Sequence, residues 1–277
     1  MSTDSFATGY GKSTSSLTKS KRLVAMDHSD KAYSEVEKLF QKGWKHPEKG
    51  KPVIRAIFTV LSPQKSLDSY AEYKYFAFNL CSISPINVLV RFQVQVVNQL
   101  SNYRRRANEQ LLFHGTSQLC PLGKNPSAPP DVCSLRSCSL CSIIKNSFEI
   151  RRCGTRHNFR RFGNGIYVTS CSSKADDYFS SPLRSNFRVL LVNRVIVGKP
   201  LKRKYNATSL NELPSGYNSV IGVPGGDLNY EETVVYHNDA IRPAYVVVYD
   251  ISPASNEAAQ RSRLGFLKSL FKTPLAS

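Results

Sequence analysis

Acidic side chains are scarce in this chain of 277 residues, and long hydrophobic runs are missing. Only 20 Asp and Glu oppose 38 Lys and Arg, which gives a formal net charge of +18. A surplus of this sign attracts polyanions such as nucleotide pyrophosphates, nucleic acids or acidic proteins. No stretch of 18 apolar residues occurs, so we expect no transmembrane segment.

The first 20 residues also lack an apolar run of the kind found in secretory signals. We therefore expect an intracellular protein, nuclear or cytoplasmic. Residues 101–165 hold eleven Lys and Arg but only three Asp and Glu. This basic segment is either a solvated surface or a contact for nucleic acid, and Arg104 to Arg106 are also compatible with a nuclear import signal.

Hydrophobic residues make up 41% of the chain, enough for an ordinary core. We expect a flexible tail over residues 1–28, one folded domain over 29–254, and a tail or amphipathic helix over 255–277. Residues 76–97 indicate an insertion or translated non-coding sequence. Periodicity predicts helices at residues 34–41 and 67–75, and strands at residues 53–61, 187–197, 233–236 and 245–249.

Five of the seven cysteines lie in a predicted insertion over residues 117–160. Four of them, Cys120, Cys133, Cys138 and Cys141, have spacings that could bind zinc. Strong zinc sites usually show two tight pairs, and here only Cys138 and Cys141 form a C-x2-C motif. The sequence therefore favours free thiols without a metal, with zinc as the alternative.

Three separated segments carry the residues best suited to chemistry. Residues 111–116 read LLFHGT, residues 162–167 read FGNGIY and continue to SSKADDY at 172–178, and residues 229–236 read NYEETVVY. Each segment lies at the edge of a strand-like run, and together they supply a His, two Tyr and a Glu. Three such motifs in this order are much less common by chance than any one of them.

These motifs resemble the catalytic core of the poly(ADP-ribose) polymerase-like, or diphtheria-toxin-like, ADP-ribosyltransferases. The resemblance implies an α+β fold of two packed, mainly antiparallel sheets, and NAD as a consumed substrate. It assigns NAD contacts to His114 and Gly115, the two faces of the nicotinamide to Tyr167 and Tyr178, and the catalytic carboxylate to Glu232. Thr116 and Ser173 complete the expected NAD-binding set.

The chemistry is consistent with these roles. Cleavage between nicotinamide and ribose leaves a sugar cation, which a nearby carboxylate stabilises. Two tyrosine faces hold a flat pyridinium ring by stacking and cation–π attraction. One departure from the family is Ala175, where many members have a serine that binds the nicotinamide amide; Ser173 is the nearest replacement.

Two other enzyme classes are disfavoured. Gly163-Asn164-Gly165 is not followed by the third glycine and helix of a Rossmann pyrophosphate turn. Transferases of the cholera-toxin type have a glutamate two residues before the catalytic one, where this chain has Tyr230. We therefore predict an NAD-dependent ADP-ribosyltransferase that makes mono- or short oligomeric products on a protein or nucleic-acid acceptor. The alternatives are an inactive NAD-binding or interaction module and an NAD glycohydrolase.

Overall fold

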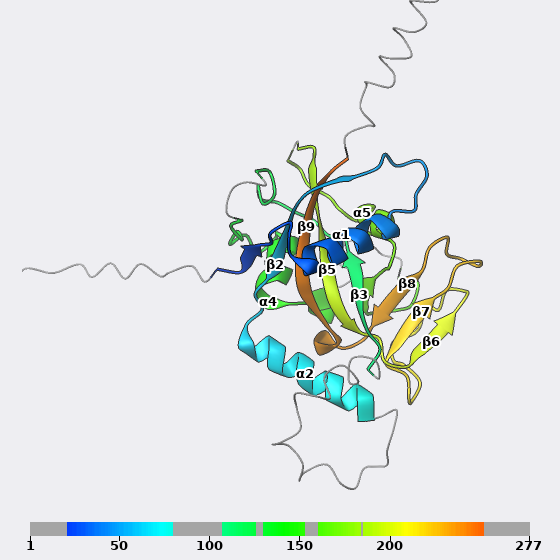
Figure 1. Ribbon diagram of the computed structural model, residues 1–277. Helices are drawn as coiled ribbons and strands as arrows, with labels where there is room; N and C mark the ends of the chain where they lie inside the picture. The colour runs from blue at the N-terminus through cyan, green and yellow to red at the C-terminus, as the bar shows by residue number, and fades with distance from the viewer. Residues whose placement is uncertain (1–20, 80–106, 126–129, 153–159, 184, 252–277) are drawn as a thin grey trace, which may run out of the picture.

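The computed structural model describes residues 21–79, 107–125, 130–152, 160–183 and 185–251 (Figure 1). Two mainly antiparallel sheets with a few helices form the domain, so the predicted α+β class is confirmed. No helix in these ranges is long and apolar enough to cross a bilayer. The expected insertion beyond residue 79, the basic triplet at Arg104, Cys153 and the expected C-terminal helix lie outside the described residues.

The larger sheet has five antiparallel strands. Its long central strands alternate strictly, so that Val246 and Val248 pack on one face while Val247 and Tyr249 pack on the other. In spatial order the strands are β1 (Leu23–Ala25), β2 (Val53–Val60), β9 (Ile241–Asp250), β5 (Phe187–Ile196) and β3 (Glu109–His114).

The smaller sheet has four strands and one parallel pair, β6 with β7, which the sequence did not predict. It joins the larger sheet through Phe113 and Thr169, whose backbones exchange hydrogen bonds of 2.8 and 3.0 Å. Its strands in spatial order are β4 (Ile166–Val168), β8 (Glu232–Val235), β7 (Ser219–Gly222) and β6 (Pro200–Arg203).

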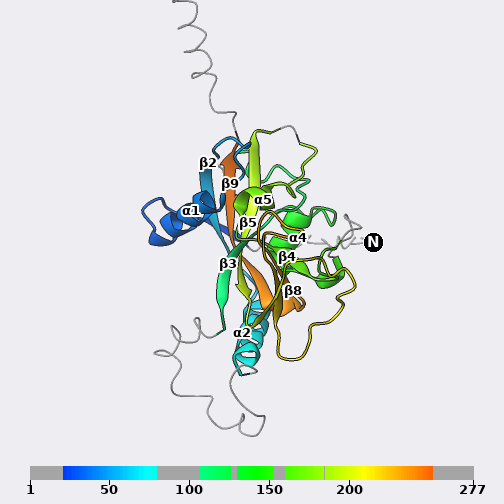
Figure 2. The ribbon, with the colours of Figure 1, turned by 90° about the vertical axis from the view of Figure 1, so that its right-hand side faces the viewer.

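Helices cover both faces of the larger sheet. The helix α1 (Lys31–Gly43) packs Tyr33, Val36 and Phe40 on one face, and α4 (Ser139–Asn146) lies on the opposite face beside β4 and β8 (Figure 2). Within the described residues, the remaining helical segments are α2 (Gln64–Asn79), α5 (Ser172–Asp176) and the single 3-10 turns η1 (Ile150–Arg152) and η2 (Asn238–Ala240).

Three sequence-based boundaries need correction. Leu23–Ala25 falls inside the expected tail over residues 1–28, yet it pairs with β2 and its Leu23 is fully buried. The helix expected at residues 67–75 is longer, since α2 runs from Gln64 to Asn79. The segment SSKADDY favours a helix that Ser172 caps and that runs through Tyr178, but α5 ends at Asp176, Tyr178 follows it in a turn, and Cys171 is the N-cap.

The helix α2 is held to the larger sheet by a carboxylate on β3. Glu109 lies 3.0 Å from the guanidinium of Arg194 and contacts the Lys74 ammonium. Burial raises the pKa of Glu109, but the hydrogen bonds and charges of these two partners outweigh it, so the net pKa is lowered. The ion pairs therefore stabilise the fold fully above the unfolded-state pKa of about 4.3, and this contribution is lost as the pH falls through the lower folded-state pKa.

We expect Glu109→Gln to lower the free energy of unfolding by about 2 kcal/mol at pH 7, because two charge-assisted hydrogen bonds are lost. The difference in free energy of unfolding between this variant and the unsubstituted protein should shrink below pH 4. Urea denaturation at pH 7 and pH 3.5 measures this. Glu35→Gln, in the exposed Lys31–Glu35 pair, is the control and should change little; a pH-independent gap for Glu109→Gln would contradict the assignment.

Candidate active site

The three motif segments converge on one pocket. The end of β3, the middle of β4 and the start of β8 meet where the two sheets join. Around them lies a cavity of about 540 Å³, which we call the central pocket. Its walls include six of the seven residues that the sequence predicted to act on NAD: His114, Gly115, Thr116, Tyr167, Tyr178 and Glu232.

His114 is held in a defined orientation at the end of β3. Its Nδ1 lies 2.8 Å from the carbonyl oxygen of Tyr167, and its ring packs edge-on against Phe148 with centroids 5.1 Å apart. Burial lowers the pKa of His114 more than this hydrogen bond raises it, so the ring is neutral at pH 7. Because a carbonyl only accepts, Nδ1 carries the proton and Nε2 is left as an acceptor.

Gly115 is required by a close approach between β3 and α5. A Cβ atom at this position would lie only 1.8 Å from the carbonyl oxygen of Ala175 and 3.1 Å from the Cβ of Tyr178. Any side chain would therefore push α5 and its following turn away. The glycine lets the backbone after His114 lie directly beside Tyr178, which shapes one end of the central pocket.

The two predicted tyrosines differ in how they are held. The hydroxyl of Tyr167 donates to the Gly163 carbonyl at 2.7 Å and accepts from the Phe162 N–H at 3.0 Å, which anchors the far end of its side chain. Tyr178 is 45% exposed. Burial and the nearby Glu232 carboxylate raise the pKa of Tyr178, so its hydroxyl is protonated at neutral pH.

Of the two adjacent glutamates, only Glu232 faces the central pocket. It is 5% exposed and its Oε1 lies 3.2 Å from the ammonium of Lys174. Glu231 is held differently: its carbonyl accepts from the hydroxyl of Thr169 at 2.6 Å and its Oε1 from the hydroxyl of Ser170 at 3.4 Å. The structure thus separates the roles of two residues that the sequence presents as a pair.

Lys174 is a site residue to which the sequence analysis assigned no role. Its ammonium contacts both Glu232 and the Tyr230 carbonyl, the latter at 3.2 Å, and it lines the central pocket. It lies in the quoted segment SSKADDY, four positions before Tyr178. A lysine reaching back from α5 to the start of β8 follows from the packing of the two segments, which no local pattern encodes.

Ser173 lies outside the central pocket. Its side chain is fully buried and its Oγ accepts hydrogen bonds from the backbone N–H groups of Lys45 and His46, at 2.9 and 3.1 Å. This serine fastens the loop after α1 to α5 and does not line the central pocket. The position of the family serine is occupied by Ala175, whose side chain supplies no hydrogen bond there.

Basic side chains form the outer part of the central pocket. Arg152, Arg160 and Arg161 all line it. Arg161 donates to the carbonyl of Asp227 at 3.1 Å, which places a guanidinium against the loop that leads into Glu232. The sequence showed these arginines only as part of a basic segment, since their approach to the pocket depends on the tertiary structure.

Comparisons with known proteins find related sequences. Residues 135–225 match the family model of the poly(ADP-ribose) polymerase catalytic domain. Over 174 residues, 61% of this chain, the chain is 28% identical to the protein mono-ADP-ribosyltransferase PARP4 of Mus musculus, of which it covers 8%. The Homo sapiens protein of the same name is 27% identical over 176 residues, 9% of its length.

The chain therefore spans less than a tenth of the length of these two relatives. The matched segment contains β4, α5, Tyr167 and Tyr178, and ends before Glu232. The two-sheet fold and this match over residues 135–225 both support a poly(ADP-ribose) polymerase-like ADP-ribosyltransferase domain in this chain.

Proposed function

We propose that this protein cleaves the bond between nicotinamide and ribose in NAD and transfers ADP-ribose to an acceptor. The observation that carries the proposal is the buried Glu232 carboxylate in the wall of a pocket that also presents two tyrosines and the free Nε2 of a neutral histidine. Such a combination suits a ligand that is aromatic at one end, sugar in the middle and charged at the other.

The nicotinamide end fits the part of the pocket between Tyr167 and Tyr178. A pyridinium ring there gains about 0.5–2 kcal/mol from cation–π attraction to the tyrosine faces. The backbone N–H and C=O of Gly115 would bind its amide, and the glycine keeps this backbone close to Tyr178 because any Cβ there would meet the Ala175 carbonyl. With Ala175 in place of a serine, the backbone supplies this recognition without help from a side-chain hydroxyl.

The ribose carries the reacting atom and lies beside Glu232 in this arrangement. When the C–N bond breaks, its electrons leave with nicotinamide, which departs neutral, and a positive charge develops on the sugar. The Glu232 carboxylate stabilises that charge more in the transition state than in bound NAD. Lys174 holds Oε1 and so directs Oε2 toward a ribose hydroxyl, while Nε2 of His114 accepts from another hydroxyl.

The second half of the reaction is the transfer of ADP-ribose to an acceptor. The loop over residues 222–230 leads into Glu232 and contains no Lys or Arg that would hold the pyrophosphate of a growing ADP-ribose chain. Arg161 contacts this loop from another segment and lines the donor pocket. We propose mono-ADP-ribosylation or short oligomers, in keeping with the names of both relatives.

The acceptor class and location are further proposals. The net charge of +18 favours an acidic protein or a nucleic acid as the acceptor. We propose the nucleus or the cytoplasm as the location of the reaction. The test of all these points is incubation of the pure protein with NAD labelled in the adenylate, with and without candidate acceptors. Free nicotinamide, protein-bound or nucleic-acid-bound label, and product length on a gel are then measured.

Each result of this experiment has a distinct meaning. Bound label at one or a few units per site, with matching release of nicotinamide, supports the transferase. Nicotinamide released without bound label indicates an NAD glycohydrolase, and NAD binding without release indicates an interaction module. Long ladders removed by a poly(ADP-ribose)-degrading enzyme would contradict the product length inferred from the loop.

Tyr178→Ala is expected to weaken NAD binding by about 1–3 kcal/mol, because one stacking face is lost. Tyr178→Phe keeps the ring and should bind nearly as well as the unsubstituted protein. Calorimetry with a non-hydrolysable NAD analogue measures both, and Tyr205→Ala, at a 67% exposed tyrosine outside the pocket, is the control. Equal affinity of Tyr178→Ala and the unsubstituted protein would remove Tyr178 from the site.

A further inference from the structure

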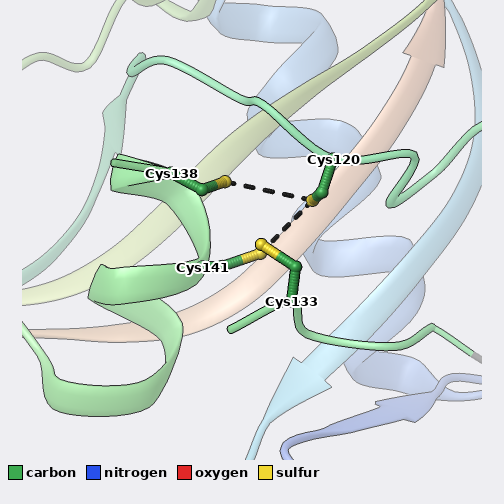
Figure 3. A group of neighbouring side chains, drawn as sticks. All are labelled: Cys120, Cys133, Cys138 and Cys141. Carbon is green, nitrogen blue, oxygen red and sulfur yellow. Dashed lines mark hydrogen bonds between the residues drawn. The ribbon is translucent and has the colours of Figure 1, made fainter. Parts of the chain in front are cut away.

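Four cysteine side chains converge at one point beside the larger sheet. All four Sγ atoms of Cys120, Cys133, Cys138 and Cys141 lie within 4.8 Å of one another. Figure 3 shows them pointing inward from three separate stretches: Cys120 from the segment after β3, Cys133 from the loop before α4, and the other two from the start of α4. This convergence is a property of the tertiary structure, since the residues span 22 positions of sequence.

The distances between the sulfur atoms match those around a tetrahedral metal ion better than they match a disulfide bond. Four sulfurs at 2.3 Å from a zinc ion are separated from each other by about 3.8 Å. Two of the contacts, Cys120 to Cys141 at 3.4 Å and Cys138 to Cys120 at 3.9 Å, lie on either side of that value. A disulfide needs about 2.05 Å, and these cysteines are free thiols.

The surroundings also suit four thiolates. The backbone N–H of Leu119 points at the Sγ of Cys138 from 3.4 Å, a donor that stabilises negative charge on sulfur. Lys145 brings its ammonium to the carbonyl of Cys133 at 2.7 Å, next to the cluster. Cys120, Cys138 and Cys141 are at most 3% exposed, so a metal held there is shielded from water.

We propose that these four cysteines bind one structural Zn²⁺ ion. Zn²⁺ replaces four thiol protons, which are released to solvent, and the four sulfurs complete a closed tetrahedron that leaves no position for a substrate. The proposal reverses the preference for free thiols that the sequence favoured. One C-x2-C pair was visible there, and the second pair of ligands is assembled only by folding.

The ion would hold one wall of the central pocket. It ties the segment after Gly115 and the loop before α4 to the first turn of that helix. α4 contributes Ser139 and Ile143 to the pocket lining, and Phe148, just beyond it, packs against His114. Apart from an isolated bridge at Ser117, the described residues between β3 and α4 form no strand or helix, so a metal would add a constraint that regular secondary structure does not supply there.

The decisive measurement is the metal content of the full chain, purified without chelators and analysed by elemental mass spectrometry. We expect about one zinc per chain. Cys138→Ser and Cys141→Ser should each lose that zinc, whereas Cys171→Ser, at a buried cysteine outside the cluster, should retain it. Cobalt(II) added to metal-stripped protein should give the intense visible absorption of a tetrahedral thiolate complex.

A second measurement uses the unsubstituted protein, so it remains informative if the cysteine variants fail to fold. Removal of zinc from the unsubstituted protein by a strong chelator should speed amide hydrogen exchange in residues 117–125 and 130–148, with β9 less affected. These measurements do not depend on NAD, so they stand apart from the proposed reaction. Unsubstituted protein that carries no zinc and takes up neither zinc nor cobalt would overturn the proposal, as would a Cys141→Ser variant that still holds one zinc.

Discussion

Glu232→Gln is expected to slow ADP-ribosyl transfer by about 10²–10³-fold, the loss typical of removing one electrostatic stabiliser of a transition state. The glutamine keeps the size of the side chain beside Lys174 but not its charge, so the developing sugar cation loses its counterion. NAD affinity should stay within about tenfold, because the carboxylate acts mainly on the transition state. Single-turnover release of nicotinamide and equilibrium binding measure the two effects separately.

The neighbouring glutamate supplies a matched control. Glu231→Gln changes the same residue type one position away, where the side chain contacts Ser170. It should retain transfer within a few-fold of the unsubstituted protein. If Glu231→Gln loses as much activity as Glu232→Gln, or if Glu232→Gln turns over normally, Glu232 is not the catalytic carboxylate.

Asp176→Asn is expected to lower the free energy of unfolding by about 3–5 kcal/mol, because it removes the anion from a buried group of cations. Asp176 is 2% exposed. Its carboxylate lies 2.7 Å from Nε of Arg188 and 2.8 Å from the Lys49 ammonium, and it accepts a hydrogen bond of 2.5 Å from the Tyr249 hydroxyl. In a domain of this size the melting temperature should fall by roughly 10 °C.

This network fixes α5, and with it the turn that carries Tyr178, to β9, β5 and the loop after α1. Asp177→Asn is the control, since its side chain is 46% exposed although it also pairs with Lys49. An exposed pair contributes little, so this variant should melt within a few degrees of the unsubstituted protein. Equal losses in the two variants would show that burial of Asp176 is not what makes its ion pairs stabilising.

From the sequence, the resemblance to a known family implied the fold class, and the motifs named most of the residues that line the central pocket. Alternating apolar residues predict strands because successive side chains of a strand face opposite sides, and the β9 run from Tyr245 to Tyr249 follows this rule. The motifs around His114, Tyr167 and Glu232 are local and are read directly from the order of residues. Leu140 and Ile144 have the spacing of one face of a helix, and both are buried on the core-facing side of α4.

Only the tertiary structure decided which members of similar pairs face the pocket. Glu231 and Glu232 are adjacent in sequence, and the folded chain turns one side chain toward Ser170 and the other toward Lys174. Ser173 resembled a ligand-binding serine, yet the packing of α5 on the loop after α1 directs it to the backbone at His46. These outcomes depend on contacts between distant segments, which no local pattern contains.

The cysteines show most clearly the difference between what the sequence predicts and what only the tertiary structure brings together. Their spacing presents one tight pair and two isolated residues, and by itself it favoured free thiols. The return of the chain from β3 to α4 brings Cys120 and Cys133 to the pair at Cys138 and Cys141, with all four sulfurs within 4.8 Å. Residue types and local periodicity are fixed by the sequence, whereas a set of ligands is defined by distances that exist only once the sheets and helices have packed.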